Sequence, residues 1–277
     1  MRTLILSEKG GVGKSFVSAN VIASAMYVAT KKKVKLGEVD ASNFTTEFYS
    51  KSNIVDGETI QIQLDARKVR DDEFMAFLEG DSTVEDTVDE KNIYAEVENA
   101  VNTIIKNGYQ VVDVGANATV VFRDTLIRKE LLKYFQYIFL VSSPNVNEIA
   151  MAVKNYEILR ENHYLQDRIF FIVNKYTDAI RSKLEKFDYI NEDNLIKIRE
   201  MGEYNTRIMS ARVTIMDVIN TYKEEDLRKE LDKAIREMKT DEIEKISSRI
   251  DLLNKAKLFY YNNDFKKLVN LFKGGAK

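Results

Sequence analysis

Short runs of apolar residues alternate along the chain with longer stretches in which apolar residues recur every three or four positions. Runs that are apolar throughout predict parallel strands buried on both faces, and the longer periodic stretches predict helices that cover the sheet. The expected strands are 3–7, 34–39, 59–64, 109–114, 137–142 and 168–174, and the expected helices are 15–30, 71–79, 93–106, 122–134 and 146–162. This order predicts an α/β fold, a doubly wound and mostly parallel sheet flanked by helices.

The strand pattern stops well before residue 223, and from there the chain is charged with a helical pattern. We expect one main domain at 1–222 and a helical C-terminal extension at 223–277, either packed on that domain or projecting from it. Residues 245–277 carry eight Lys and Arg against two Asp and Glu, although the net charge of the whole chain is −2. The end of the chain is therefore locally basic.

A phosphate-binding loop is predicted at residues 9–15, KGGVGKS, between the first expected strand and the first expected helix. Glycines at positive φ can turn backbone N–H groups toward phosphate oxygens, and the helix start adds the positive end of its dipole. The loop lysine supplies a charge near the β- and γ-phosphates, and the hydroxyl after it suits Mg²⁺. The residues expected to bind the nucleotide are Gly10, Gly11, Val12, Gly13, Lys14, Ser15 and Phe16, with Ser15 also at the metal.

One feature of this loop departs from the standard pattern, which needs glycine at position 8, where the chain has Glu8. With Lys9 ahead of its glycines, the loop resembles the deviant Walker A motif of the ParA/MinD superfamily of P-loop ATPases. The resemblance covers roughly residues 1–220 and implies a domain that binds ATP with Mg²⁺. It also implies that Lys9 reaches across an ATP-dependent homodimer to the phosphates held by the other subunit.

Acidic residues stand where two of the expected strands end, and the carboxyl ends of parallel strands gather the chemistry of such sheets. Asp113 ends an apolar run before Gly115, a Walker B-like ending whose carboxylate can hold Mg²⁺ through water. The resemblance implies that Asp40 orients the attacking water and approaches the metal through water. The family usually has an aspartate two residues earlier, where this chain has Glu38. For Asp40 and Glu38, a solvated strand end is the alternative.

Asn174 closes the last expected strand, at a position from which the resembling family recognises the adenine base. An asparagine amide donates and accepts hydrogen bonds at once, which matches the edge of a purine. The alternative is an asparagine that only forms a turn.

The resemblance implies a slow, in-line attack of water on the γ-phosphate of ATP. Lys14, Asp40 and a Lys9 from the other subunit would be the catalytic residues, acting by positioning and charge neutralisation. ATP would close the homodimer and hydrolysis would open it, with a small adaptor protein as the activator.

Composition excludes several classes of protein. With no cysteine, the chain has no disulfide and no Cys-ligated metal or iron–sulfur site, which excludes the cluster-dependent iron proteins of the same superfamily. No apolar stretch approaches the roughly 18 residues of a membrane span, and the apolar N-terminus is too short for a signal peptide. We expect a cytoplasmic protein, associated with the nucleoid or peripherally with a membrane.

An amphipathic helix is expected near the C-terminus. Its apolar face carries Phe265, Leu268, Val269 and Phe272, and its basic residues are Lys266, Lys267 and Lys273. Three interpretations are open: the apolar face packs on its own domain, the lysines contact DNA phosphates without reading bases, or the helix binds an anionic membrane as MinD tails do.

Two classes of function follow from these interpretations. The one we favour is a ParA-like ATPase that drives plasmid or chromosome segregation, because the sequence opens directly on the ATPase domain and has a basic C-terminal end. The alternative is a MinD-like positioning ATPase that uses a membrane or a protein assembly as its platform. A nucleotide-binding regulator that barely hydrolyses ATP is a third reading.

Overall fold

The computed structural model describes residues 1–40, 49–62, 88–200 and 204–275. Within them, seven strands form one sheet in the order β3-β2-β4-β1-β5-β6-β7, and every neighbouring pair is parallel. The strands are β1 (Thr3–Leu6), β2 (Val34–Asp40), β3 (Val55–Gln61), β4 (Val111–Val114), β5 (Tyr137–Ser142), β6 (Ile169–Asn174) and β7 (Leu195–Ile198). The prediction of a doubly wound parallel sheet is confirmed.

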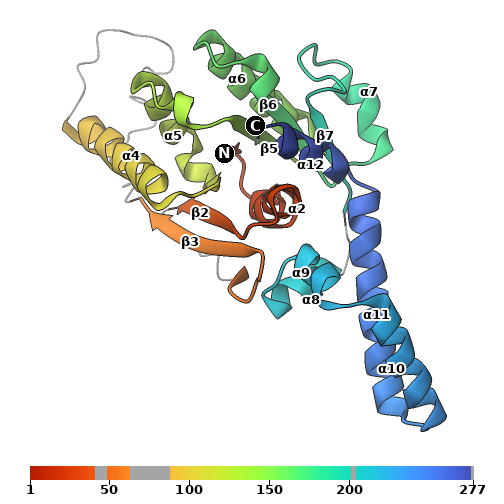
Figure 1. The fold of residues 1–277 in the computed structure, drawn as a ribbon. Coiled ribbons are helices and arrows are strands. Elements are labelled where there is room, and N and C mark those ends of the chain that lie inside the picture. Colours follow the sequence, from red (N-terminus) through yellow and green to blue (C-terminus); the bar gives the residue numbers. More distant parts are fainter. Residues whose placement is uncertain (41–48, 63–87, 201–203, 276–277) are drawn as a thin grey trace.

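Helices connect the strands and continue past the last of them (Figure 1). The α-helices are α1 (Lys14–Phe16), α2 (Ser24–Thr30), α4 (Val88–Asn107), α5 (Thr119–Arg128), α6 (Val146–Glu161), α7 (Arg181–Leu184), α8 (Tyr204–Ala211), α9 (Ile215–Thr221), α10 (Glu224–Arg236), α11 (Thr240–Tyr261) and α12 (Phe265–Gly274). A π-helical segment, η1 (Val17–Ala23), joins α1 to α2, and short 3₁₀ turns are η3 (Ala116–Ala118), η4 (Leu132–Tyr134), η5 (Gln166–Arg168) and η6 (Asp178–Ile180).

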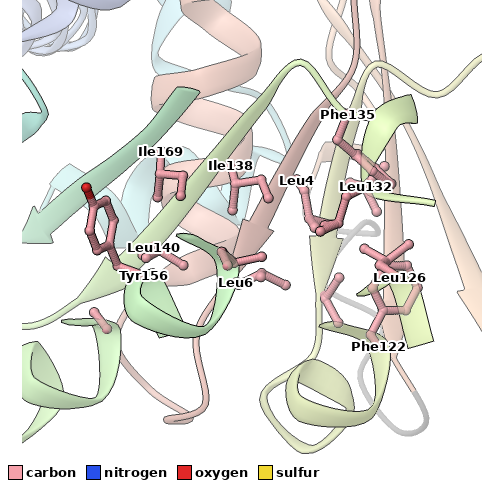
Figure 2. Packing of buried hydrophobic residues seen from close by; sticks show 14 of the residues in the cluster. Leu4, Leu6, Phe122, Leu126, Leu132, Phe135, Ile138, Leu140, Tyr156 and Ile169 are labelled. Atoms are coloured by element: carbon pink, nitrogen blue, oxygen red, sulfur yellow. The ribbon is translucent and has the colours of Figure 1, made fainter. Parts of the chain in front are cut away.

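Successive residues of each strand point to opposite faces of the sheet, so the apolar strands feed two separate cores. Leu4 and Leu6 of β1 belong to the core covered by α4, α5 and α6, part of which Figure 2 shows. Ile5, between them, belongs to the opposite core, which is covered by η1, α2, α9 and the C-terminal helices. This arrangement explains why the predicted strands lack polar alternation.

The predicted helix at 15–30 is present, but residues 17–23 of it form the π-helix η1. A π-helical turn widens the helix and frees backbone carbonyl groups from their usual partners. The carbonyl of Asn20 accepts a hydrogen bond from the Tyr260 hydroxyl at 2.9 Å, and the Ser24 hydroxyl donates to the Ala19 carbonyl at 3.0 Å. Side-chain hydroxyl groups, one of them from α11, thus donate hydrogen bonds to carbonyl groups of the helix that begins at the loop.

Two edge strands differ from the sequence prediction. β3 begins at Val55, ahead of the predicted 59–64, and the polar residues at 56–58 are exposed at the edge of the sheet. It forms by backbone pairing with β2, a signal that apolar periodicity does not carry. β7 was not predicted, because Leu195–Ile198 is a four-residue edge strand interrupted by a lysine.

Two predicted helices have different outcomes. The prediction of one helix over 122–134 is wrong, because α5 ends at Arg128, Glu130 has a positive φ of 54°, and a 3₁₀ turn follows. The predicted helix at 71–79 lies outside the described residues.

The C-terminal extension has two parts. α10 and α11 form an antiparallel hairpin that projects away from the sheet (Figure 1) and has a small core of its own, with Leu227, Ala234, Ile246 and Leu253 buried. α12 then returns to the main body of the protein and packs beside α2.

The apolar face of α12 is buried in this packing. Phe265, Leu268 and Phe272 are 8%, 0% and 0% exposed, and the ring of Phe272 makes edge contacts with those of Tyr137 and Phe139 on β5. The expectation that these three residues contact a membrane or DNA is therefore corrected: they pack on their own domain, where transfer from water stabilises the fold. No helix in the described part of the chain is long and apolar enough to span a bilayer.

Substituting Phe272→Ala should lower the free energy of unfolding by about 3–5 kcal/mol, because it removes a fully buried ring and leaves a cavity. The neighbouring exposed residue provides the control, since Lys273→Ala should change stability by no more than about 0.5 kcal/mol. Urea unfolding followed by circular dichroism measures both. Equal stabilities of the two variants would contradict the packing of α12 described here.

Candidate functional site

The phosphate-binding loop joins the carboxyl end of β1, near the centre of the sheet, to α1. Gly11 and Gly13 have φ values of 80° and 83°, in the left-handed region that glycine adopts most readily. A Cβ atom built on Gly10 or Gly11 would meet no other atom within 4 Å, so the loop borders open space. Helical bonding starts where the Val17 N–H donates to the Gly13 carbonyl at 3.0 Å.

Asn174, at the end of β6, holds the backbone of this loop through a hydrogen bond. Its side-chain amide is almost fully buried and donates a hydrogen bond to the Val12 carbonyl at 2.8 Å. The same amide nitrogen would lie only 2.3 Å from a Cβ atom on Gly13. Only glycine therefore fits at position 13 while Asn174 holds the loop. Contact between Asn174 and an adenine base stays a prediction.

Lys14 and Asp113 form a buried ion pair between the loop and the sheet. The Lys14 ammonium lies 2.7 Å from Asp113 Oδ1, and their side chains are 11% and 1% exposed. Two residues predicted from separate motifs are thus brought together. A buried carboxylate needs a nearby cation or hydrogen-bond donors, and Lys14 supplies both.

Glu38 stands beside this ion pair. In the register of β2 with β4, Glu38 is opposite Asp113, and both residues are buried. Paired residues of adjacent strands share a face of the sheet, which here is the face covered by the loop helix. Burial raises the pKa of the Tyr49 hydroxyl, and the negative charges of Asp113 and Glu38 raise it further. Glu38 and Asp113 thus place two carboxylates side by side at the carboxyl ends of β2 and β4, and Lys14 pairs with the second.

The two other residues predicted at the metal come from α1 and β2, the elements that also carry Lys14 and Glu38. Ser15 follows Lys14 in α1, and Asp40 is the last residue of β2, with its side chain outside the described part of the structure. Within the described residues, no group of three or more His, Cys, Asp and Glu could hold a metal alone. Mg²⁺ commonly takes one or two protein ligands and completes its shell with phosphates and water. The Ser15 hydroxyl and the Asp113 carboxylate are ligand types that suit a magnesium ion bound with a polyphosphate.

Lys9 differs from Lys14 in its surroundings. Its side chain is exposed, and among the described residues no carboxylate pairs with its ammonium group. Its backbone is held by Ser7, whose hydroxyl lies 3.2 Å from the Lys9 carbonyl and 3.4 Å from the Lys9 nitrogen. The loop therefore carries one lysine turned into the site and one at its surface.

A sequence-family model matches residues 3–257, almost the whole chain, and describes the CobQ/CobB/MinD/ParA nucleotide binding domain. The chain belongs to this family. The match agrees with the glycine loop, with Lys14 and with the carboxylates at the strand ends. It identifies residues 3–257 as a nucleotide-binding domain. The sequence-based expectation of a ParA/MinD relative is confirmed. No curated protein sequence matches the chain.

Solved structures with a similar fold include three from two organisms. The MinC:MinD cell division protein complex of Aquifex aeolicus is 20% identical, with 78% of this chain and 87% of that chain covered and a TM-score of 0.45. MinD of the same organism is 20% identical, with 76% and 86% covered and a TM-score of 0.43. A putative plasmid partition protein of Borrelia burgdorferi B31, bound to AMPPNP, is 16% identical, with 91% and 98% covered and a TM-score of 0.45. The family assignment rests on the sequence-family match.

The three lysines predicted as contacts in the tail are not equivalent. Lys266 and Lys273 are exposed on α12. Lys267 is half-buried, donates to the carbonyls of Glu192 and Leu195, and has its pKa lowered by burial. Lys267 therefore holds the start of β7 and the chain just before it, and of the three lysines Lys266 and Lys273 are the exposed ones.

The sequence predicted the phosphate-binding loop and the acidic ends of β2 and β4, but not the side-chain contacts that hold the loop against the sheet. Nothing in the pattern indicated that Asn174 supports the loop backbone. Tyr49 carried no motif, although its buried hydroxyl is within 3.3 Å of Asn20 Nδ2 and lies near Glu38 and Asp113. Strand register is the signal for Glu38, since β2 aligned on β4 places it opposite Asp113.

Substituting Gly13→Ala should destabilise the protein by about 1–3 kcal/mol, because the new methyl group requires a strained backbone and displaces Asn174. Gly10→Ala is the matched control, since a Cβ there meets open space, and its stability should stay within about 0.5 kcal/mol. Thermal and urea unfolding without nucleotide measure both variants. A Gly13→Ala protein as stable as Gly10→Ala would mean that Asn174 does not hold the loop in this way.

Proposed function

We propose that the protein is an ATP-driven dimerisation switch that hydrolyses ATP slowly and acts in DNA partition, as ParA-like ATPases do. The observation that carries the proposal is the pair of loop lysines with opposite surroundings. Lys14 is turned into the site against Asp113, whereas Lys9 is exposed and has no carboxylate partner among the described residues. A lysine side chain with no carboxylate partner among the described residues of its own subunit is available to act on another.

Binding of a polyphosphate would change the partner of Lys14. The ammonium group now neutralises Asp113, and the phosphates would compete for it with a greater negative charge. Asp113 would then accept a hydrogen bond from metal-bound water. The ion pair thus keeps both residues in place without nucleotide and exchanges partners when nucleotide binds.

Hydrolysis would depend on positioned charges more than on a strong base. The loop N–H groups and Lys14 would hold the phosphates, Ser15 and Asp113 would hold Mg²⁺, and Asp40 would orient the attacking water. Mg²⁺, when bound, would neutralise charge that develops on the phosphates. Without Lys9 from a second copy the site would be one cation short, so turnover by a monomer would be slow. A small adaptor protein would raise the rate by stabilising the complete dimer.

The surface of α12 supports DNA as the platform. The membrane alternative rested on a free apolar face, and that face is buried against the domain, with Leu268 and Phe272 fully covered. Lys266 and Lys273 remain exposed and can contact backbone phosphates, which gives salt-dependent binding without base readout.

Substituting Lys9→Ala should weaken ATP-induced dimerisation at least about tenfold, because one direct charge-assisted contact contributes more than 1.4 kcal/mol. Binding of ATP to the monomer should change little, since the Lys9 side chain lies outside its own subunit's site. Sedimentation velocity measures the dimer, and fluorescence titration with a labelled ATP analogue measures binding. The control is Lys32→Ala, an exposed lysine that precedes the amino end of β2, whereas the loop follows the carboxyl end of β1. Normal dimerisation and turnover by Lys9→Ala would refute the switch.

The double substitution Lys266→Ala/Lys273→Ala should weaken ATP-dependent binding to non-specific duplex DNA and reduce the slope of log K against log salt by about 1–2. This pair is preferable to deleting residues 262–277, which would also remove the buried face of α12. The control is Lys183→Ala/Lys186→Ala, two exposed lysines, one in α7 and one just after it. DNA binding unchanged by the first pair, or ATP-dependent binding to anionic liposomes alone, would contradict the DNA platform.

A further inference from the structure

Arg123 of α5 is a buried cation directly beneath the phosphate-binding loop. Its side chain is 3% exposed, and its Nε and Nη2 atoms each lie 2.8 Å from Asp124 Oδ1. Its Nη1 atom donates to Asn155 Oδ1 at 2.6 Å and lies 3.3 Å from Glu8 Oε1. The guanidinium fork is thereby shared between its neighbour in α5, a residue of α6, and the loop residue that breaks the standard motif.

Asn155 of α6 completes the cluster around Glu8. Its amide nitrogen donates to Glu8 Oε1 at 2.7 Å and to the Met151 carbonyl at 2.9 Å. Its amide oxygen accepts the hydrogen bond from Arg123 Nη1. One carboxylate oxygen of Glu8 therefore accepts bonds from both α5 and α6. A cavity of about 10 Å³ lined by Glu8, Lys9, Met151 and Asn155 leaves room for no more than a water molecule there.

The backbone on both sides of Glu8 is also fixed. The Thr119 hydroxyl of α5 lies 3.0 Å from the Ser7 carbonyl, and the Ser7 hydroxyl contacts the backbone of Lys9. The Lys9 side chain itself is exposed, so the place where it starts is set by its backbone, which Ser7 and the anchored Glu8 hold from one side. A long exposed lysine side chain loses conformational entropy when it binds. If the backbone of Lys9 is already fixed, no backbone entropy is lost in addition.

We propose that Glu8 is a positioning residue, held by Arg123 and Asn155, that fixes the backbone of Lys9 in the orientation from which its ammonium reaches a second copy of this chain. The proposal rests on the function proposed for Lys9. It also gives a role to Glu8, which stands where the standard loop has glycine. The Glu8 carboxylate anchors the loop to α5 and α6, which a glycine could not do.

The chain has no cysteine, so a single spin label can be attached at position 9 through Lys9→Cys. Electron paramagnetic resonance should show restricted motion of this label without nucleotide. Adding Glu8→Ala should shorten its rotational correlation time about twofold or more, and Glu8→Gln, which keeps an acceptor oxygen, should restore most of the restriction. A label at Lys32→Cys is the control and should not respond to either change at Glu8.

In the chain with Lys9 intact, Glu8→Ala should also weaken ATP-induced dimerisation by about threefold or more, with ATP binding to the monomer nearly unchanged. If Glu8→Ala does not fold, Asn155→Ala provides the same comparison, since it removes one anchor and keeps the pair of Arg123 with Glu8. Unchanged motion at position 9 in whichever variant folds would overturn the proposal. Normal dimerisation by Lys9→Ala would instead overturn the proposed function, and would leave the motional result to stand as loop anchoring alone.

Discussion

The ion pair between Lys14 and Asp113 joins the phosphate-binding loop to the centre of the sheet. Asp113 is 1% exposed and has Glu38 as its neighbour on β2, so two carboxylates lie at the carboxyl ends of these adjacent strands. Removing the cation would leave a buried carboxylate uncompensated, a state that costs several kcal/mol. The loop is therefore held in place by the same charges that, in the proposed function, a bound polyphosphate would redistribute, and its backbone at Gly10 and Gly11 borders open space.

The C-terminal extension is built into this arrangement. α12 completes the core beside α2, the Tyr260 hydroxyl bonds to a carbonyl of the π-helix η1, and the ring of Phe259 packs edge-on against that of Phe16, two residues after Lys14. Packed elements with specific contacts move together more readily than they deform. The projecting hairpin of α10 and α11 is consequently in direct contact, through the end of α11, with the helix that begins at the phosphate-binding loop.

The sequence was sufficient for features that one local pattern carries. Apolar runs located the central strands, and the glycines with Lys14 located the loop. Patterns failed where pairing or tertiary contact decides the structure: β3 starts among exposed polar residues, β7 is four residues long, and the apolar stripe of α12 looks the same whether it meets a membrane or Phe139. The anchoring of Glu8 depends on Arg123 and Asn155, which are distant in sequence and belong to no motif.

The central claim is that ATP, acting through a loop already formed in the monomer, brings two copies of the chain together. Sedimentation equilibrium of the unmodified protein with Mg²⁺ and no nucleotide, ADP or a non-hydrolysable ATP analogue tests it most directly. The account predicts a monomer with ADP or without nucleotide and a dimer with the ATP analogue. A monomer under all three conditions at concentrations that saturate the site, or a dimer of equal strength under all three, would contradict it.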